Sequence, residues 1–215
     1  MTRTFITGVN RGIGAALAAE ASARGHDVIG TSRDGADQTL PLSLGDPAQV
    51  AAQLAGRIDG AVDIVINNAG VIGPARQSTL DMDWAGFADA LAINTLAPLA
   101  VAQTLLPNLR QSRSPKIITV SSQMSWMGYA KSDRIAYRAS KAAVNKVMQG
   151  LATDLEPDGI AVLLVDPGWV RTDMGGQDAA EDPADVARGI LDIADRVNLS
   201  DTGKFFRFTG EERPF

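Results

Sequence analysis

The sequence predicts an α/β fold in which a parallel β-sheet of about seven strands is covered by helices on both faces. Short apolar, β-rich stretches alternate with longer helical patterns along the chain, an order typical of βαβ units. Most of these short stretches are continuously apolar, as expected for strands that are covered on both faces. The length of 215 residues and the hydrophobic content of 45% fit one domain with a full core. We therefore expect a single domain over residues 1–215.

The predicted elements follow one another without an internal repeat or a long linker. Between the strands lie helical stretches that include residues 13–24, 91–106 and 134–155. The strands are expected at residues 4–7, 28–32, 39–42, 62–66, 116–120, 161–165 and 204–208.

Composition and charge exclude several classes of function. The chain has 20 Lys and Arg against 25 Asp and Glu, a net charge of −5, and no long run of one sign. This balance argues against nucleic acid or an anionic membrane as a partner. With no cysteine and a single histidine, His26, the chain lacks thiolate chemistry and the side chains of a typical metal site.

The sequence also gives expectations about location. The start of the chain enters an apolar strand that is too short for the core of a signal peptide, so we expect a cytoplasmic protein. Residues 91–106 are apolar but are interrupted by Asn94, Pro98 and other polar residues. They fall short of the ~18 uninterrupted apolar residues of a membrane span, so we interpret them as a buried helix.

A glycine-rich turn follows the first predicted strand and opens the first helix. Gly8, Gly12 and Gly14 allow the backbone to turn tightly and to approach a pyrophosphate closely. The exposed N–H groups at the start of the following helix favour the same anion. The alternative is a plain glycine turn, but the position between strand and helix favours a Rossmann-like, doubly wound dinucleotide-binding fold.

The end of the second predicted strand indicates which dinucleotide binds. An acidic side chain at this place would bind the ribose 2′-hydroxyl, whereas this chain has Ser32 followed by Arg33. A small polar residue and a cation suit a 2′-phosphate, and Arg11 in the glycine turn lies where it could reach the same group. We therefore predict NADP(H) as the preferred cofactor, with NAD(H) as the alternative if Arg33 is only a solvated charge.

Three further strand ends bring polar residues to the same edge of the sheet. Residues 67–70 form an amide-rich turn, Ser121 and Ser122 end the fifth strand, and Asp166 begins a turn after the sixth. The serines are either crevice residues or ordinary turn residues. Within the apolar helix, Pro98 has no N–H for the carbonyl of Asn94. That carbonyl is free to hold a water molecule, although a simple helix kink explains the pair equally well.

Tyr137 and Lys141 form a candidate proton-transfer pair. They are four residues apart in a predicted helix, so their side chains lie on one face. An ammonium near a phenol favours the phenolate and lowers its pKa, which would let the hydroxyl exchange protons near neutral pH. Taken alone, the pair is also compatible with a coincidence of helical spacing.

Together these residues resemble the short-chain dehydrogenase/reductase family. The resemblance extends from the first strand to residue 215, and residues 137–145 and 203–210 are most similar to C-factor/sniffer-type carbonyl reductases. The motifs that carry it, in family order and near-family spacing, are Thr7, Gly8, Gly12 and Gly14; Asn67, Asn68, Ala69 and Gly70; Asn94; Ser122; Tyr137 and Lys141; and Pro167, Gly168 and Thr172.

The resemblance implies a role for each catalytic candidate. Tyr137 would be the general acid or base, and Ser122 would donate a hydrogen bond to the developing oxyanion. Lys141 would lower the pKa of Tyr137 and bind the nicotinamide ribose, and Asn94 would hold a relay water. Thr172 would fix the carboxamide. Cofactor contacts are expected from Gly8, Arg11, Gly12, Ile13, Gly14, Ser32, Arg33, Asn68, Ala69, Gly70, Tyr137, Lys141, Pro167, Gly168, Val170 and Thr172; no metal site is expected.

Three departures from the family pattern leave alternatives open. The interval from Ser122 to Tyr137 is about two residues longer than the common spacing, so Ser121 and Ser125 remain alternatives as the active serine. Ser43 stands where an acidic residue often contacts the adenine. Residues 169–182 are short for a substrate lid and predict a shallow pocket of broad substrate choice. Its expected lining is Gln123, Met124, Trp126, Trp169 and Met174.

The leading hypothesis is an NADPH-dependent oxidoreductase that reduces a small aldehyde, ketone or quinone, or oxidises the alcohol in reverse. The alternative is an NADP(H)-binding signalling or regulatory protein of C-factor type with little turnover. The intact catalytic set favours the enzyme. We expect a small-molecule partner, no nucleic acid, no membrane, and a homodimer or homotetramer formed through the apolar helices at residues 91–106 and after Tyr137.

Overall fold

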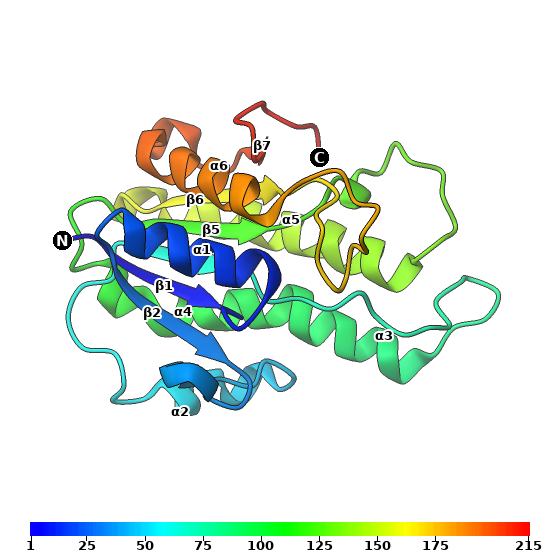
Figure 1. Cartoon of the computed structure of the whole chain (residues 1–215), viewed down its shortest axis with the longest axis horizontal. Helices are drawn as coiled ribbons and strands as arrows, with labels where there is room; N and C mark the ends of the chain where they lie inside the picture. The colour runs from blue at the N-terminus through cyan, green and yellow to red at the C-terminus, as the bar shows by residue number, and fades with distance from the viewer.

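The sheet is fully parallel and has seven strands. The computed structural model describes residues 1–215, and its strand order is β3-β2-β1-β4-β5-β6-β7. This order reverses direction beside β1, where ligands of doubly wound folds bind, and it confirms the predicted Rossmann-like fold (Figure 1). The strands are β1 Arg3–Thr7, β2 Asp27–Ser32, β3 Leu40–Pro41, β4 Ile64–Asn67, β5 Lys116–Val120, β6 Ala161–Asp166 and β7 Phe205–Arg207.

All seven predicted strands are present, although some bounds differ. The predicted strand at residues 62–66 starts two residues later, at Ile64, because the backbone N–H of Val62 bonds to Asn108 at the end of a helix. β3 is reduced to Leu40–Pro41 at the edge of the sheet. A proline there removes a ladder donor, which a short edge strand tolerates.

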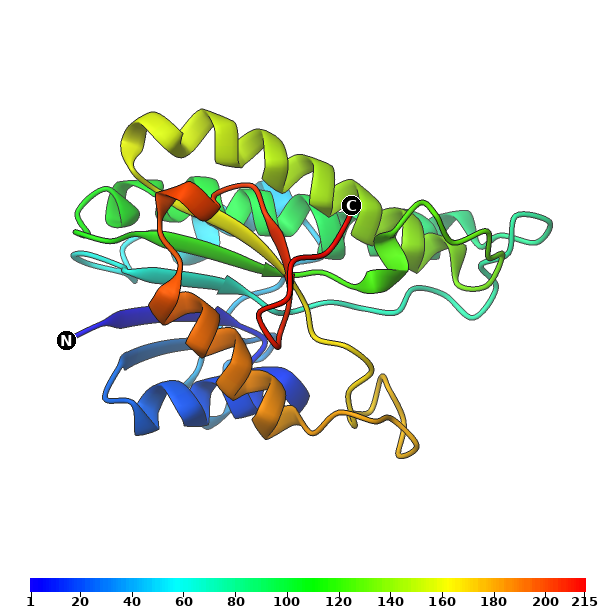
Figure 2. The same cartoon turned by 90° about the horizontal axis from the view of Figure 1, so that it is seen from above.

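Five of the six α-helices cover the two faces of the sheet. α2, α4 and α5 pack on one face against residues such as Phe5 and Ile117, and α1 and α6 pack on the other face against Ile6 and Ile66. Figure 2 shows these layers edge-on, with α5 on one side of the strands and α1 and α6 on the other. The helices are α1 Gly12–Ala23, α2 Val50–Leu54, α3 Trp84–Leu91, α4 Ala97–Leu109, α5 Ile135–Leu155 and α6 Pro183–Arg196.

A π-helical segment joins α3 to α4. Ala92–Leu96 has the wider π geometry, with the N–H of Ala97 bonded to the carbonyl of Ala92. Pro98 explains the change, because it removes the N–H that the carbonyl of Asn94 would use in an α-helix. The result is one continuous helix, Trp84–Leu109, with a mean hydropathy of 1.4 over its most apolar window, long and apolar enough to span a membrane. The helix is partly buried: 39% of that window lies inside the structure, and Val101 and Leu105 of α4 belong to the core.

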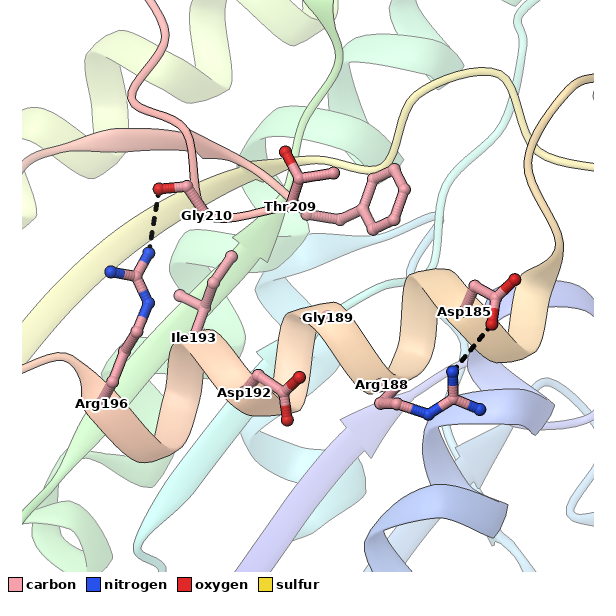
Figure 3. A pocket seen from close by; sticks show the side chains of 9 residues that line it. Asp185, Arg188, Gly189, Asp192, Ile193, Arg196, Thr209 and Gly210 are labelled. Carbon is pink, nitrogen blue, oxygen red and sulfur yellow. Dashed lines mark hydrogen bonds and ion pairs between the residues drawn. The ribbon is translucent and has the colours of Figure 1, made fainter.

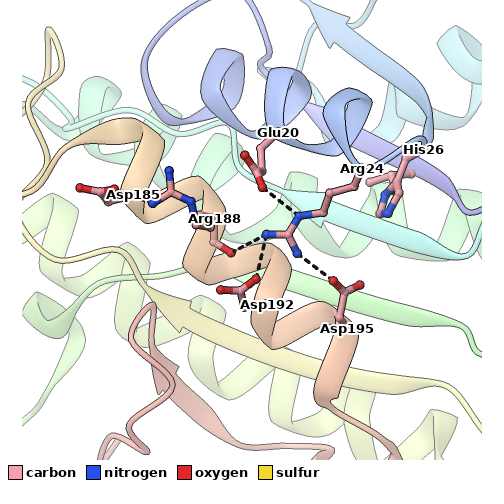
Figure 4. Close-up of polar contacts among 8 residues, drawn as sticks. Glu20, Arg24, His26, Asp185, Arg188, Asp192 and Asp195 are labelled. Atoms are coloured by element: carbon pink, nitrogen blue, oxygen red, sulfur yellow. Dashed lines mark hydrogen bonds and ion pairs between the residues drawn. The ribbon is translucent and has the colours of Figure 1, made fainter.

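An ion cluster ties α1 to α6 (Figure 4). Arg24, just after α1, donates to Glu20 at 2.9 Å, to Asp192 at 2.8 Å and to Asp195 at 2.7 Å. Its side chain is 21% exposed, and it also donates to the backbone carbonyl of Arg188. One guanidinium therefore gathers carboxylates from both helices on the outer side of the sheet, opposite α5.

Candidate functional site

A cavity of about 1230 Å³ lies along the carboxyl ends of the central strands. It brings together sequence motifs that are far apart in the chain. The predicted residues that line it are Gly8, Arg11, Gly12, Ile13, Gly14, Ser32, Arg33, Asn68, Ala69, Gly70, Ser122, Tyr137, Lys141, Pro167, Gly168, Val170 and Thr172. Ser43 and Ser121 also line it, whereas Asn94 and Ser125 are buried behind its wall.

The glycine turn has the geometry that its sequence predicts. Gly8 and Gly12 have φ of 73° and 55°, in the left-handed region that favours glycine. At Gly14, a Cβ atom would lie 1.9 Å from the carbonyl oxygen of Gly8, so only glycine fits this approach of helix to strand. Asn68 braces the turn by donating to the carbonyls of Thr7 and Gly8 at 2.9 and 3.2 Å. The turn is preformed and presents the start of α1 to the cavity.

At the end of β2, Arg33 lines the cavity and forms no ion pair. The hydroxyl of buried Ser32 donates to Asp34 at 3.0 Å and accepts from the N–H of Gly35. These bonds organise the turn. The N–H of Ala36, which donates to Asp34 at 3.2 Å, lowers the pKa of the Asp34 carboxyl most, and the hydrogen bond from Ser32 lowers it further. Arg11 pairs with Asp173 at 2.8 Å across the cavity, and both side chains are about three quarters exposed. Such an exposed pair is weak.

The side chain of Asn94 is fully engaged within the protein. Its Oδ1 accepts from the N–H of Val71 at 2.8 Å, and its Nδ2 donates to the carbonyl of Val71 at 2.8 Å and to Ser140 at 2.9 Å. Asn94 is 1% exposed. The side chain therefore fastens the π-segment to the loop after β4 and to α5.

Tyr137 and Lys141 lie in α5 as predicted, and both are almost fully buried. The ammonium of Lys141 donates to the carbonyl of Val120 at 2.8 Å and lies 5.9 Å from the centroid of the Tyr137 ring. Burial raises the pKa of Tyr137 to about 12 and lowers the pKa of Lys141 to about 8. In this structure the effect of burial exceeds any lowering of the phenol pKa by the lysine.

Of the three candidate serines, Ser122 is the one that faces Tyr137. The Ser122 side chain is the one whose nearness lowers the pKa of the phenol, against the larger effect of burial. The other two hydroxyls are turned to Asn145 of α5: Ser121 donates to its Oδ1, and Ser125 accepts from its Nδ2 at 2.8 Å. Ser125 also donates to the backbone carbonyl of Ser122 at 2.6 Å. The two neighbouring serines thus support the loop that presents Ser122.

Comparison with known proteins agrees with this geometry. The family model for short chain dehydrogenases matches residues 2–183. The chain belongs to the short-chain dehydrogenase family. It is accordingly an oxidoreductase of CH–OH and C=O groups, and the resemblance seen in its sequence is confirmed.

Two curated relatives show how far the likeness extends within the short-chain dehydrogenases. The protein named C-signal from Myxococcus xanthus is 42% identical over 158 residues, which cover 73% of this chain and 94% of the relative. The 3-oxoacyl-(acyl-carrier-protein) reductase FabG of Escherichia coli is 32% identical over 233 residues, covering 96% of this chain and 92% of the relative.

Solved structures of short-chain dehydrogenases superpose on the whole chain. The NADPH-bound carbonyl reductase from chicken fatty liver has a TM-score of 0.89 at 25% identity and covers 100% of this chain and 99% of its own. The carbonyl reductase Sniffer of D. melanogaster has the same TM-score and identity, with complete coverage of both chains.

The substrate side of this short-chain dehydrogenase differs in part from the sequence prediction. Gln123, Met124, Trp169 and Met174 line the cavity as expected. The expectation for Trp126 is wrong: Trp126 does not line the cavity, and its ring packs edge-on against Tyr129, with centroids 4.8 Å apart. The residues that line this end without having been predicted include Tyr129, Lys131, Asp133, Arg134 and Arg138.

One positioning contact and one strained residue were also missed. Gln77, in the loop before α3, accepts from the N–H of Tyr137 at 3.2 Å and supports the start of α5. That start is strained, because Arg134 has φ of 51°. Neither feature has a sequence signal, since a glutamine in a loop and an arginine before a helix are ordinary residues.

A second, smaller hollow lies beside α6, away from the motif residues (Figure 3). Its volume is about 190 Å³, and its lining includes Asp185, Arg188, Asp192, Arg196 and Gly210. The charged groups here already have partners: Arg188 pairs with Asp185 at 2.8 Å, and Arg196 donates to the carbonyl of Gly210 at 3.0 Å. None of the motif residues of the short-chain dehydrogenase family lines this second hollow.

Proposed function

We propose that this short-chain dehydrogenase uses NADPH to reduce the carbonyl of a small aldehyde, ketone or quinone, or runs the reverse alcohol oxidation. The observation that carries the proposal is that Tyr137 and Ser122 lie together on the wall of a cavity that the glycine turn also lines. The structural neighbours that are named as NADPH-bound and as carbonyl reductases support it. We also propose that residues 1–215 form a single domain, which contains the whole site.

The residues present fit a dinucleotide. The turn that closes on Gly14 leaves no room for a side chain and aims the N–H groups of α1 at the cavity, which suits a pyrophosphate. Asn68, Ala69 and Gly70 would contact the cofactor beside this turn. Pro167, Gly168, Val170 and Thr172 would hold the nicotinamide end. The chemistry supplied by the bound cofactor is hydride transfer.

In the proposed reaction Tyr137 donates its proton to the substrate oxygen, and Ser122 donates a hydrogen bond to the same oxygen. The high pKa of buried Tyr137 keeps the phenol protonated and ready to donate. Lys141 is proposed to bind the nicotinamide ribose, and its positive charge would favour the phenolate that remains. The backbone carbonyl of Asn94 is proposed to hold the water that returns a proton to the site.

The preference for NADP(H) over NAD(H) is proposed from Arg33, a cation without an ion-pair partner at the ribose end of the cavity. Arg11 would join it after giving up its weak, exposed pair with Asp173. Replacement of Arg33 by Ala should weaken NADPH binding at least tenfold and leave NADH binding nearly unchanged. Isothermal titration with both cofactors measures this, and tighter binding of NADH by the wild type would refute the assignment.

Turnover separates the enzyme from the signalling alternative. Purified protein should consume NADPH when it is mixed with members of a panel of aldehydes, ketones and quinones. We favour the enzyme, because Tyr137, Ser122 and Lys141 are all present and brought to one cavity. Tight NADPH binding without turnover on any carbonyl of the panel would favour a regulatory role instead.

The remaining proposals concern the setting of the reaction. We propose a cytoplasmic enzyme that acts on small molecules, without nucleic acid or a membrane as partner. We also propose a homodimer or homotetramer formed through α4 and α5, since Leu96, the last residue of the π-helical segment before α4, is 49% exposed. Sedimentation velocity tests the assembly, and a Leu96→Asp variant should shift it toward the monomer.

A further inference from the structure

Asp166, at the end of β6, is a buried carboxylate that joins two loops of the cavity. It is 0% exposed. Its Oδ1 accepts from the backbone N–H of Gln123 at 3.1 Å and from that of Gly168 at 3.0 Å. Gln123 directly follows Ser122, and Gly168 belongs to the loop proposed to hold the nicotinamide. One oxygen atom therefore fixes the position of the serine loop relative to the cofactor loop.

The second oxygen of Asp166 faces a cation. Oδ2 is buried and accepts no hydrogen bond, but Arg213 Nη2 lies 3.3 Å away. The side chain of Arg213 is 25% exposed. A carboxylate out of water is costly unless a counter-charge lies close. Arg213 provides that charge from a position 47 residues farther along the chain.

The segment after β7 delivers Arg213 to this place. The chain turns at Gly210, whose N–H donates to the carbonyl of Arg207, and then pairs back on β7. The N–H of Arg213 donates to the carbonyl of Phe205 at 2.7 Å, and Phe215 packs on the Phe205 ring with centroids 5.8 Å apart. Figure 2 shows this red segment crossing near the end of the strands. The guanidinium of Arg207 is turned to Glu181 instead.

We propose that Asp166 and Arg213 are positioning residues of the proton-transfer site: Asp166 locks the Ser122 loop against the Gly168 loop, and Arg213 neutralises the carboxylate beside Tyr137. This inference rests on the proposed function only for the role of Tyr137. It makes residues 209–215 a working part of the site, although none of them lines the large cavity.

The charges around Tyr137 determine in which direction each substitution should move the pKa of its phenol. Burial is the largest influence and raises the pKa of the phenol; Ser122 lowers it, the charge of Asp166 raises it and Arg134 lowers it. The Lys141 ammonium is 5.9 Å from the ring centroid. Removal of the Asp166 charge should therefore favour the phenolate. Loss of Arg213 should disfavour the phenolate, because the carboxylate is then uncompensated.

A direct titration of Tyr137 tests this. The chain has two tyrosines, so in a Tyr129→Phe background the phenolate absorbance reports Tyr137 alone. Rapid pH jumps allow the signal to be read before the chain unfolds. We expect Asp166→Asn to move the midpoint down by about one pH unit and Arg213→Met to move it up. Arg213→Lys should restore the wild-type value.

Arg196→Met is the matched control. Arg196 donates to the carbonyl of Gly210 in the same turn (Figure 3), whereas the ion pair of Asp166 is with Arg213. It should leave the midpoint unchanged. Shifts of the same sign in Asp166→Asn and Arg213→Met, or no shift in either, would overturn the inference. If Asp166→Asn fails to fold, the contrast between Arg213→Met and Arg213→Lys decides.

The titration uses neither cofactor nor substrate, so its result is independent of turnover. If the variants show the expected shifts but the wild type reduces no carbonyl, the proposed function is refuted and the positioning role stands. A wild type that reduces carbonyls through Tyr137, with variants that do not shift, would refute only the positioning role.

Discussion

Replacement of Gly14 by Ala tests the glycine turn most sharply. The added Cβ would lie 1.9 Å from the carbonyl oxygen of Gly8 and 2.6 Å from Nδ2 of Asn68. A carbon and an oxygen need a separation of more than about 3 Å, so α1 would have to move away from the turn by about 1 Å. Because both Gly8 and Asn68 are fixed by backbone hydrogen bonds, neither can move aside without cost.

The size of the effect follows from the cost of overpacking, about 1–3 kcal/mol. If this free energy is lost from cofactor binding, because the turn no longer has the shape that binds the pyrophosphate, the dissociation constant for NADPH rises by about 5- to 150-fold. Any part of this free energy that is lost from the stability of the fold lowers the midpoint of thermal unfolding. Isothermal titration with NADPH and thermal denaturation of the same protein separate these two parts.

Gly150→Ala is the matched control. Gly150 lies in α5, and a Cβ atom there would meet nothing within 4 Å. Alanine should stabilise this helix by about 1 kcal/mol and leave NADPH affinity unchanged. If Gly14→Ala binds NADPH as tightly as the wild type and unfolds at the same temperature, the turn is not the tight cradle described here.

Three other changes test separate features. Arg24→Met should lower the free energy of unfolding, measured by chemical denaturation, by about 2 kcal/mol, since it removes charge-assisted bonds between α1 and α6. The control Arg188→Met should lower it much less. Equal losses of stability in the two variants would refute the role of Arg24. Burial lowers the pKa of Lys141 to about 8, so the unfolded chain binds more protons between about pH 8 and 10.5. Relative to Lys141→Met, the wild type should therefore gain up to about 3 kcal/mol of stability as pH rises through that window, whereas a flat difference would contradict the burial of the charge. Arg134→Asn should preserve or raise thermal stability, because asparagine tolerates the φ of 51° and because the substitution removes a cation from a helix N-terminus. The midpoint of the Tyr137 titration should rise, since Arg134 lowers the pKa of the phenol. A fall in that midpoint would refute the influence assigned to Arg134.

The sequence predicted those parts of the site that depend on local pattern. Gly8, Gly12 and Gly14 follow a strand and open a helix, and this order specifies a turn whatever packs around it. The spacing of Tyr137 and Lys141 likewise places them on one helical face, and both line the cavity. The seven strands were found because buried parallel strands are continuously apolar.

The parts that failed depend on burial and on contacts between distant residues. The pKa of Tyr137 is dominated by burial, and the ammonium of Lys141 is held by Val120, neither of which a spacing reveals. Trp126 was assigned to the pocket from its position, but it packs on Tyr129. The ion pair of Asp166 and Arg213 joins residues whose proximity only the turn after β7 creates.

The most direct test of the account is the rate of NADPH oxidation with a carbonyl substrate in wild type and in Tyr137→Phe. NADPH affinity is measured alongside, so that a loss of rate is not confused with a loss of cofactor. We predict that the phenylalanine variant binds NADPH normally and loses about 10²- to 10⁴-fold in kcat, the usual contribution of a general acid. Equal rates in the two proteins would contradict the assignment of Tyr137 as the proton donor.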